Sequence, residues 1–113
     1  MTVLIETRTW IQVCQYDDLL PERGAAALLD AGQVAIFRTH DGDMFAISNR
    51  DPFSGAHVMS RGIVGTRGDA PTVASPMHKQ VFDLRTGICL DDPAVRVSVF
   101  AVRVHNGVVE VST

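Results

Sequence analysis

The chain has 113 residues, of which 46% are hydrophobic and 20% are charged, and its formal net charge is −3. These values predict one globular domain over residues 1–113 with a hydrophobic core of its own, and they exclude a disordered chain. Apolar runs such as residues 24–29 and 97–102 are far too short to span a membrane, and no block of Lys and Arg is present. We therefore expect neither a membrane nor nucleic acid as a partner.

Two features bear on the cellular compartment. The first residues show no basic stretch followed by an apolar core, so we expect no signal peptide and a cytoplasmic location. The two cysteines, Cys14 and Cys89, are far apart, and neither belongs to a Cys-x-x-Cys pair. We expect two reduced, at least partly buried thiols, although the sequence alone leaves a disulfide open.

The first half of the chain predicts short strands joined by tight turns. Runs rich in β-branched and aromatic residues place the expected strands at residues 10–14, 25–29, 33–39 and 44–48. Residues 17–24 are too short for a stable helix, so we expect a turn or one helical turn there. Turns are also expected at 30–32 and at 40–43, where Asp41 and Gly42 suit a hairpin because Gly readily adopts a positive φ.

The middle of the chain differs in composition. Residues 49–70 contain four glycines and three arginines but only a short apolar piece at 62–65. We expect a long ordered loop region here, the kind of segment that carries function in a compact domain. Short strands are expected at 71–75 and 80–84, on either side of a turn at 76–79.

The end of the chain predicts the clearest hairpin. A long strand is expected over residues 95–104. One face of this strand would carry Val95, Val97, Val99 and Ala101. The Asn106–Gly107 pair predicts a type I′ turn, after which residues 108–111 form the last strand. Strands linked by tight hairpins indicate an all-β fold, an antiparallel sandwich or barrel.

Two loops, at about residues 49–55 and 75–80, resemble the cluster-binding loops of a Rieske [2Fe–2S] domain. Such loops read Cys-Pro-His-x-Gly and then Cys-Pro-x-His-Gly-x-x-Phe-Asp, followed by Thr-Gly. Here Asp51 and Ser75 stand at the cysteine positions and Phe53 stands at the first histidine position. Only His78 keeps a ligand type, whereas a Rieske centre needs two thiolates and two imidazoles. We therefore expect no cofactor, no metal and no catalytic residue on this chain.

Two of these residues have alternative roles to weigh. His78 could ligate a mononuclear metal together with Asp51 or His57, but such a histidine needs two or three further ligands, which the spacing does not supply. We expect a loop histidine, exposed or hydrogen-bonded to the backbone. Asp51 precedes Pro52, and an Asp in this place more often bonds the backbone of its own turn than acts as a catalytic carboxylate.

Phe53 has two interpretations that the sequence does not separate. Its ring could pack inward, into the space of the missing cluster, or it could anchor a partner, because aromatic residues are enriched at interface centres. Basic side chains would gather nearby if the two loops meet, namely Arg50, Arg61, Arg67 and Lys79. The candidate partner interface consists of Pro52, Phe53, Arg61, Pro76, Lys79 and Gln80.

Beyond the loops, the chain resembles the small subunit of the bacterial assimilatory NAD(P)H-dependent nitrite reductase. The resemblance rests on residues 10–14, 18–24, 33–38, 45–53, 60–62, 73–76, 79–80, 82 and 86–92. It implies a Rieske-type β-fold with a small inserted loop subdomain that lacks the cluster ligands. It also implies a large partner subunit, which carries FAD, an iron–sulfur cluster and sirohaem and reduces nitrite to ammonia with NAD(P)H. This chain would dock on that subunit without being catalytic itself.

Three other functions stay open at this point. The chain could be a Rieske-type electron-transfer ferredoxin with atypical ligands, which the missing thiolates oppose. It could be a metal-dependent enzyme that uses His57 and His78, although no ligand motif is present. It could also be a stand-alone binding or regulatory module, because a fold does not determine a function.

Overall fold

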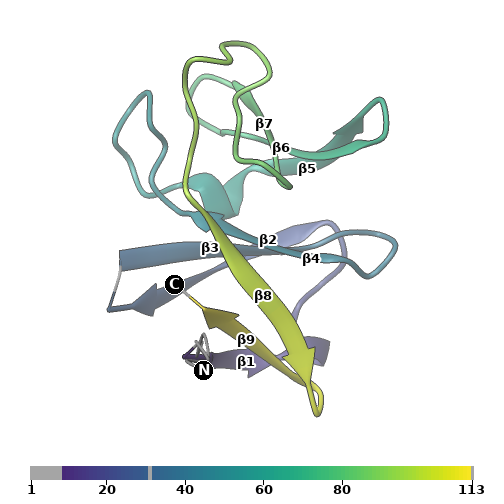
Figure 1. Cartoon of the computed structure of the whole chain (residues 1–113). Helices are drawn as coiled ribbons and strands as arrows, with labels where there is room; N and C mark the ends of the chain where they lie inside the picture. The colour runs from purple at the N-terminus through teal and green to yellow at the C-terminus, as the bar shows by residue number, and fades with distance from the viewer. Residues whose placement is uncertain (1–8, 31, 113) are drawn as a thin grey trace, which may run out of the picture.

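Two antiparallel sheets organise the computed structural model, which describes residues 9–30 and 32–112. The strands are β1 Ile11–Gln15, β2 Arg23–Leu29, β3 Gly32–Arg38, β4 Met44–Ser48, β5 Ile63–Arg67, β6 Ala70–Ala74, β7 Val81–Asp83, β8 Val99–His105 and β9 Val108–Ser112. The larger sheet has the order β1-β9-β8-β4-β3-β2, and the smaller one has the order β5-β6-β7. Two short 3-10 helices, η1 Tyr16–Asp18 and η2 Met59–Arg61, complete the described elements. Figure 1 shows the smaller sheet and its loops above the larger sheet.

The hairpins predicted from the sequence are confirmed. Strands β2 and β3 pair from Arg23–Arg38 to Leu29–Gly32, although Ala31 in their turn lies outside the described residues. The turn between β3 and β4 has Gly42 at φ +89°. In the turn between β8 and β9, Asn106 and Gly107 have φ values of +52° and +76°. Positive φ at both central residues is the type I′ geometry, which matches the twist of the flanking strands.

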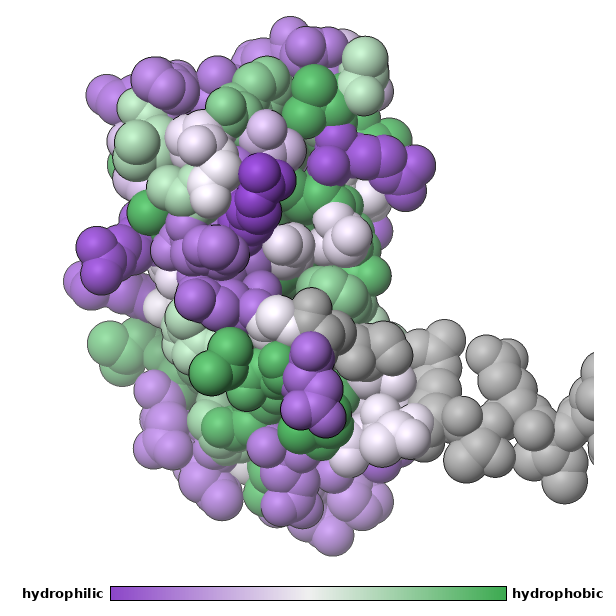
Figure 2. Space-filling view, turned by 90° about the vertical axis from the view of Figure 1, so that its left-hand side faces the viewer, coloured by the Kyte–Doolittle hydropathy of each residue, from purple (hydrophilic) through white to green (hydrophobic). Residues whose placement is uncertain are grey.

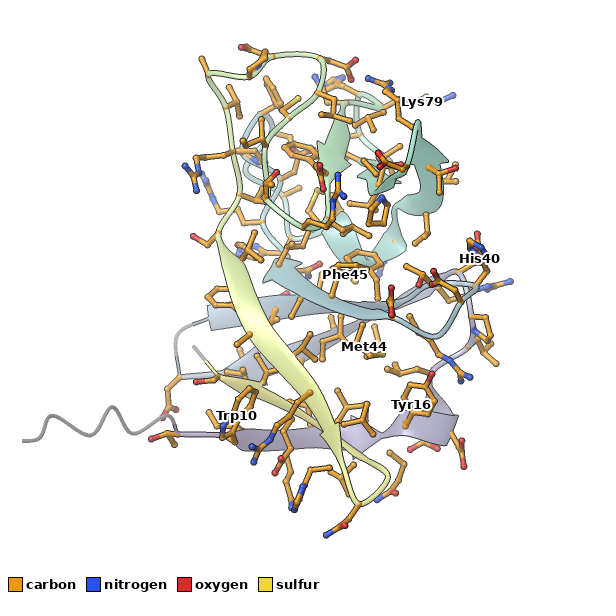
Figure 3. The ribbon with its side chains drawn as sticks, turned by 45° about the vertical axis from the view of Figure 1, so that its right-hand side comes forward. Trp10, Tyr16, His40, Met44, Phe45 and Lys79 are labelled. Atoms are coloured by element: carbon orange, nitrogen blue, oxygen red, sulfur yellow. The ribbon has the colours of Figure 1, made fainter. Side chains whose placement is uncertain are left out.

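Strands β3 and β4 are buried on both faces, because a core lies on each side of them. Val34 and Ile36 face a lower core, where they meet Val109 and Val111 of β9 as the six-stranded sheet curls over on itself. Phe37 belongs to an upper core beneath the smaller sheet. Figure 3 shows the same division on β4, where Phe45 points toward the smaller sheet and Met44 toward the lower core. Burial on both faces explains the uninterrupted apolar run at residues 34–37.

The expectation of a loop over residues 49–70 is wrong in its second half. Strand β5 pairs with β6 along its whole length, from Ile63–Ala74 to Arg67–Ala70. Only Val64 of β5 is buried, so the strand has no alternating apolar pattern that its sequence could reveal. Pairing with β6 makes this segment a strand, and its local hydrophobicity does not.

The long strand expected over residues 95–104 is also corrected. Strand β8 begins only at Val99, and the residues before it cross from the upper loops to the larger sheet (Figure 1). Val97 is buried in the upper core and its N–H donates to the carbonyl of Gly87. Val99, in contrast, is 41% exposed. The prediction that Val95, Val97, Val99 and Ala101 share one face is therefore wrong. The segment packs in the upper core at Val97 and joins the larger sheet only from Val99.

Cys14 is half-buried and Cys89 is buried, and both are free thiols, as expected from the sequence. Burial raises the pKa of the Cys14 thiol, and the nearby carboxylate of Asp18 raises it further. In residues 9–30 and 32–112, no helix is long and apolar enough to cross a membrane. The expectation about a signal peptide concerns residues 1–8, which lie outside the described part of the chain.

Candidate functional site

The loop that follows β4 closes on itself through Asp51. The N–H of Asp51 donates to the carbonyl of Ala56 at 2.8 Å, and the N–H of Gly55 donates to the carbonyl of Asp51 at 2.7 Å. One carboxylate oxygen of Asp51 accepts from the N–H of Phe53 at 2.8 Å and from that of Ser54 at 3.4 Å. The prediction that Asp51 bonds the backbone of its own turn is confirmed.

The loop between β6 and β7 repeats this pattern on Ser75. Its N–H donates to the carbonyl of Gln80, and its carbonyl accepts from the N–H of Lys79, both at 2.9 Å. The hydroxyl oxygen of Ser75 accepts from the N–H of Met77 at 3.3 Å. Lys79 has φ +61° and Gly55 occupies the equivalent place in the first loop with φ +79°. A lysine in the left-handed backbone conformation costs about 1–2 kcal/mol, so the rest of the loop must stabilise a conformation that this residue disfavours.

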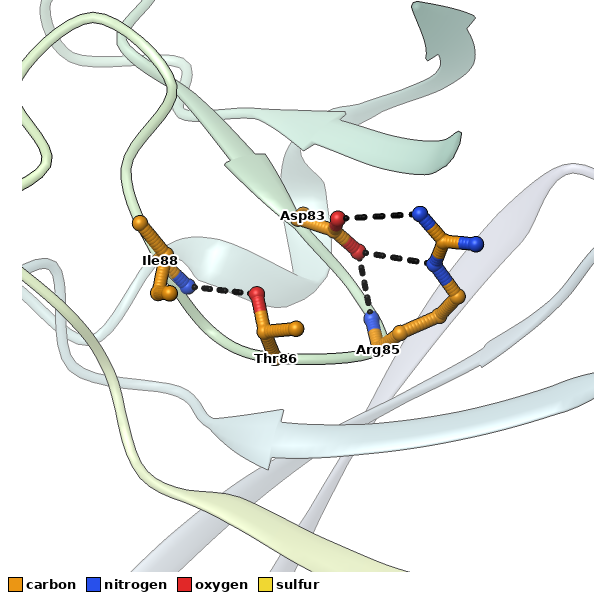
Figure 4. A network of polar contacts seen from close by, with 4 residues as sticks. All are labelled: Asp83, Arg85, Thr86 and Ile88. Atoms are coloured by element: carbon orange, nitrogen blue, oxygen red, sulfur yellow. Dashed lines mark hydrogen bonds and ion pairs between the residues drawn. The ribbon is translucent and has the colours of Figure 1, made fainter. Parts of the chain in front are cut away.

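A third copy of the pattern follows β7, on Asp83 (Figure 4). The N–H of Asp83 donates to the carbonyl of Ile88 at 2.9 Å, and Gly87 donates back at 2.7 Å. The carboxylate accepts from the N–H of Arg85 at 2.8 Å and also from its guanidinium. The sequence relates the first two loops to each other through their Rieske-like pattern, but it does not predict that the loop on Asp83 shares their backbone pattern. A signal was present, since Asp51 and Asp83 are each followed four residues later by a glycine.

The first two loops are joined to each other by a buried hydrogen bond. The hydroxyl of Ser75 donates to Oδ2 of Asp51 at 2.5 Å, and both residues are almost completely buried. Burial alone would raise the pKa of Asp51, but the hydrogen bonds from Ser75, Phe53 and Ser54 outweigh it and hold the pKa below its ordinary value. Asp51 is therefore an ionised acceptor at the centre of the loop pair.

The residues of this loop pair do not fit a [2Fe–2S] cluster. A Rieske cluster needs two thiolates, yet Asp51 and Ser75 present oxygens that are bonded to each other. Cys14 lies on β1, and Cys89 is part of the upper core, so neither belongs to the pair. Within the described ranges, no three His, Cys, Asp or Glu side chains form a group that could hold a metal ion. His57 and His78 are both exposed.

Phe53 combines the two roles that the sequence left open. Its ring centroid lies 6.2 Å from that of Phe82, which is buried in the upper core, while Phe53 itself remains 38% exposed. The ring therefore rests on the core with one side and reaches solvent with the other. Met77 at the tip of the second loop is 47% exposed. Together they give the loop pair an apolar surface.

The other interface candidates are divided between two places. Pro76 and Lys79 are exposed on the second loop, while Pro52 and Gln80 are half-buried. Figure 3 shows Lys79 near the top of the upper loops, far from the labelled His40. Arg61 instead lies in a hollow between β2 and β5, beside Arg23. Arg67 forms an ion pair with Asp91 at 3.4 Å. Asp91 also accepts from the N–H of Val81, so this ion pair lies near the end of the second loop, whereas Arg61 lies apart from the loop tips.

Comparison with known proteins defines the class first. A model of the family described as "Rieske-like [2Fe-2S] domain" matches residues 9–112, in agreement with the all-β fold and the paired loops. The NADH-dependent nitrite reductase small subunit of Escherichia coli strain K12 is 46% identical over 102 residues, which cover 89% of this chain and 94% of that protein. This chain belongs to the family of nitrite reductase small subunits. The Rieske-type fold and the family expected from the sequence are confirmed.

Solved structures agree with this assignment. The crystal structure of a protein described as an NADH-dependent nitrite reductase small subunit, from Mycobacterium tuberculosis, matches with a TM-score of 0.91 and 52% identity. The match covers 96% of this chain and 97% of that one. The ferredoxin of carbazole 1,9a-dioxygenase from Nocardioides aromaticivorans matches with a TM-score of 0.76 and 27% identity, over 91% of this chain and 96% of that one.

One relative places a similar segment inside a much longer chain. The nitrite reductase [NAD(P)H] large subunit of Klebsiella oxytoca is 37% identical over 103 residues. These residues cover 91% of this chain but only 11% of that protein. A domain of this kind is therefore part of the large subunit itself in that relative.

Proposed function

We propose that this chain is the non-catalytic small subunit of an assimilatory nitrite reductase and docks on a large subunit. That subunit would carry FAD, an iron–sulfur cluster and sirohaem, and would use NAD(P)H to reduce nitrite to ammonia in the cytoplasm. The family supports this proposal, because its members are named as small subunits of that enzyme. The Klebsiella oxytoca large subunit adds support, since a domain that is fused to a protein in one relative commonly binds the separate protein in another.

The observation that carries the proposal is the hydrogen bond between Asp51 and Ser75. We infer that Asp51, Phe53, Ser75 and His78 occupy the four positions that hold ligands in a cluster-bearing relative. In this chain the space is closed by a carboxylate and a hydroxyl that bind each other. A loop pair with this donor set supplies shape and rigidity, and its contribution to the reaction is then to bind the catalytic subunit in one geometry.

The docking surface would be centred on the two loop tips. Phe53 is a suitable anchor, because an aromatic ring that is backed by a rigid core loses little freedom on binding. Pro52, Pro76 and Met77 would extend the apolar centre, and Lys79 and Gln80 would form part of its rim. Arg61 lies apart from the loop tips, in the hollow between β2 and β5, so it would contact the large subunit only if that subunit also reaches this hollow.

Co-purification from the native host tests this function. The tagged chain should bring down a large protein with sirohaem absorption and nitrite-dependent NAD(P)H oxidation, whereas the isolated chain should be colourless. The similarity to a dioxygenase ferredoxin makes an electron carrier the second candidate. A brown isolated chain with the absorption bands of a [2Fe–2S] cluster would establish the carrier and refute the proposed subunit role.

A further inference from the structure

A shallow hollow of about 160 Å³ lies beside the first loop, where β4 ends. Its lining consists of Ser48, Arg50, Pro52, Arg96, Val97 and Ser98. The first three residues end β4 and begin the first loop, and the others lead into β8. The N–H of Ser48 donates to the carbonyl of Ser98 at 2.9 Å, which holds the two segments in register. Figure 2 shows the side of the molecule on which the first loop projects, with strongly hydrophilic residues over the middle of that face.

Two arginines, Arg50 and Arg96, are among the residues that line this hollow, and no Asp or Glu is among them. Arg67, Arg85 and Arg103 form ion pairs with acidic partners. Among residues 9–30 and 32–112, Arg50 and Arg96 have no ion-pair partner, and neither do Arg23, Arg38 and Arg61. The hollow that holds Arg23 and Arg61 is also lined by Glu22, whereas the hollow beside the first loop has no acidic lining residue. Nη2 of Arg50 lies over the first loop, 3.3 Å from where a Cβ on Gly55 would be.

Four acidic residues line a cavity near the opposite end of β4. This cavity of about 280 Å³ beside the turn at 40–43 is lined by the carboxylates of Glu22, Asp41, Asp43 and Asp69. The cationic groups in that cavity are already engaged, since His40 contacts Glu22 at 3.2 Å and Arg85 binds Asp83. The hollows at the two ends of β4 therefore differ in lining: two arginines and no acidic residue at one end, and four acidic residues with His40 and Arg85 at the other. A surface with acidic groups would be attracted to the arginine end and repelled from the other.

We propose that the Arg50–Arg96 hollow receives a carboxylate side chain, Asp or Glu, of the large subunit. This inference rests on the proposed function and extends its docking surface from the loop tips across Pro52 to the start of β8. The planar fork of Arg matches the two oxygens of a carboxylate, and the hydroxyls of Ser48 and Ser98 add donors at the rim of the same hollow. Pro52 belongs both to the hollow and to the loop-tip surface, so one partner face would cover both.

Charge reversal in the full-length chain tests this inference. Arg50→Glu and Arg96→Glu are each compared with Arg23→Glu, an exposed arginine on β2 that undergoes the same charge change far from the hollow. Binding to the purified large subunit is measured at low and at physiological salt. We expect each reversal in the hollow to weaken binding by about tenfold and to reduce the salt dependence of the association rate, with Arg23→Glu close to wild type. Thermal unfolding checks that all three variants fold.

The outcomes separate this inference from the proposed function. If all three reversals have equal effects while Phe53→Ala still weakens binding, the inference about the hollow is wrong, but the proposed subunit role stands. No binding of the wild-type chain to the large subunit would overturn both. A titration with inorganic phosphate, followed by the amide NMR shifts of Ser48 and Ser98, tests whether the hollow binds a free anion instead of a side chain of the large subunit. Saturation by phosphate that does not compete with the large subunit would also overturn the inference.

Discussion

The hydroxyl of Ser75 and the carboxylate of Asp51, 24 residues apart in the chain, form a buried hydrogen bond of 2.5 Å. This bond joins two loops that are built on the same backbone pattern and end in the exposed side chains Phe53 and Met77. A cross-link between loops that a metal cluster could provide is here made by two side-chain oxygens and one proton. This bond adds to the backbone hydrogen bonds that close each loop, and it fixes the two loops relative to each other.

Removal of the hydroxyl should destabilise the protein. In Ser75→Ala, Oδ2 of Asp51 stays buried without its donor, and a buried acceptor left without a partner costs about 1–3 kcal/mol, more if charged. Denaturant unfolding measures this loss. The control Ser98→Ala removes an exposed hydroxyl and should stay within about 0.5 kcal/mol of wild type. Equal stability of the two variants would show that the bond contributes nothing to the fold.

Asp51 should make stability depend on pH on the acid side. Its folded-state pKa lies below the ordinary value, because hydrogen bonds from Ser75, Phe53 and Ser54 outweigh the effect of burial. The stabilisation is therefore complete above the unfolded pKa of about 3.9, and it is lost as pH falls through the lower folded value. Unfolding free energies from neutral pH to strongly acidic pH should show this loss.

The isosteric variant Asp51→Asn isolates that carboxylate. It keeps an oxygen for the N–H of Phe53 but cannot ionise, so its stability curve should be flatter than that of wild type below about pH 4. Asp92→Asn serves as the control, since Asp92 is exposed in a turn. If Asp51→Asn loses as much stability at acid pH as the wild type does, Asp51 is not an ionised, hydrogen-bonded carboxylate in the folded protein.

Gly87 should be far less replaceable than Gly68. Both have positive φ, +78° and +63°, so Ala at either place costs about 1–2 kcal/mol in conformation. A Cβ on Gly87 would also come to 2.2 Å from the carbonyl oxygen of Val97, whereas one on Gly68 meets nothing within 4 Å. Gly87→Ala should therefore exceed Gly68→Ala by about 1–3 kcal/mol in unfolding free energy. Similar losses would mean that the close approach of Val97 to the third loop is absent in solution.

Substitutions of Phe53 and of its neighbour Phe82 should affect different quantities, the affinity for the large subunit and the stability of the fold. Phe53→Ala removes a ring that is 38% exposed, so we expect about a tenfold to hundredfold loss of affinity for the large subunit with a modest loss of stability. Phe82→Ala opens a cavity in the upper core and should cost about 3–5 kcal/mol of stability. Calorimetric titration and denaturant unfolding give the two quantities.

A matched surface control is available for this binding experiment. Leu28 is 81% exposed on β2, which ends the order of the larger sheet, and it is not part of either loop tip, so Leu28→Ala should leave affinity unchanged. If Leu28→Ala weakens binding as much as Phe53→Ala does, the partner covers the edge of the larger sheet, and the loop tips are not the docking surface.

Local chemistry was enough to predict the hairpins and to find that the residues at the ligand positions do not fit a [2Fe–2S] cluster. Asp41–Gly42 and Asn106–Gly107 reveal their turns because the required positive φ is a property of two adjacent residues. The same holds for the ligand positions, since no arrangement in space turns Asp51 or Ser75 into a thiolate. For the same reason the family could be identified from the order and spacing of residues along the chain.

Contacts between distant segments decided the rest. Strand β5 is formed by its pairing with β6, and Val97 packs in the upper core before β8 begins. Arg50 and Arg96 line one hollow because β4 and the start of β8 are held in register. The Asp51–Ser75 bond belongs to the same group. Residue types by themselves determined what these side chains can and cannot bind. Which of them meet was decided by the tertiary structure, because burial and pairing depend on neighbours that the local sequence does not contain.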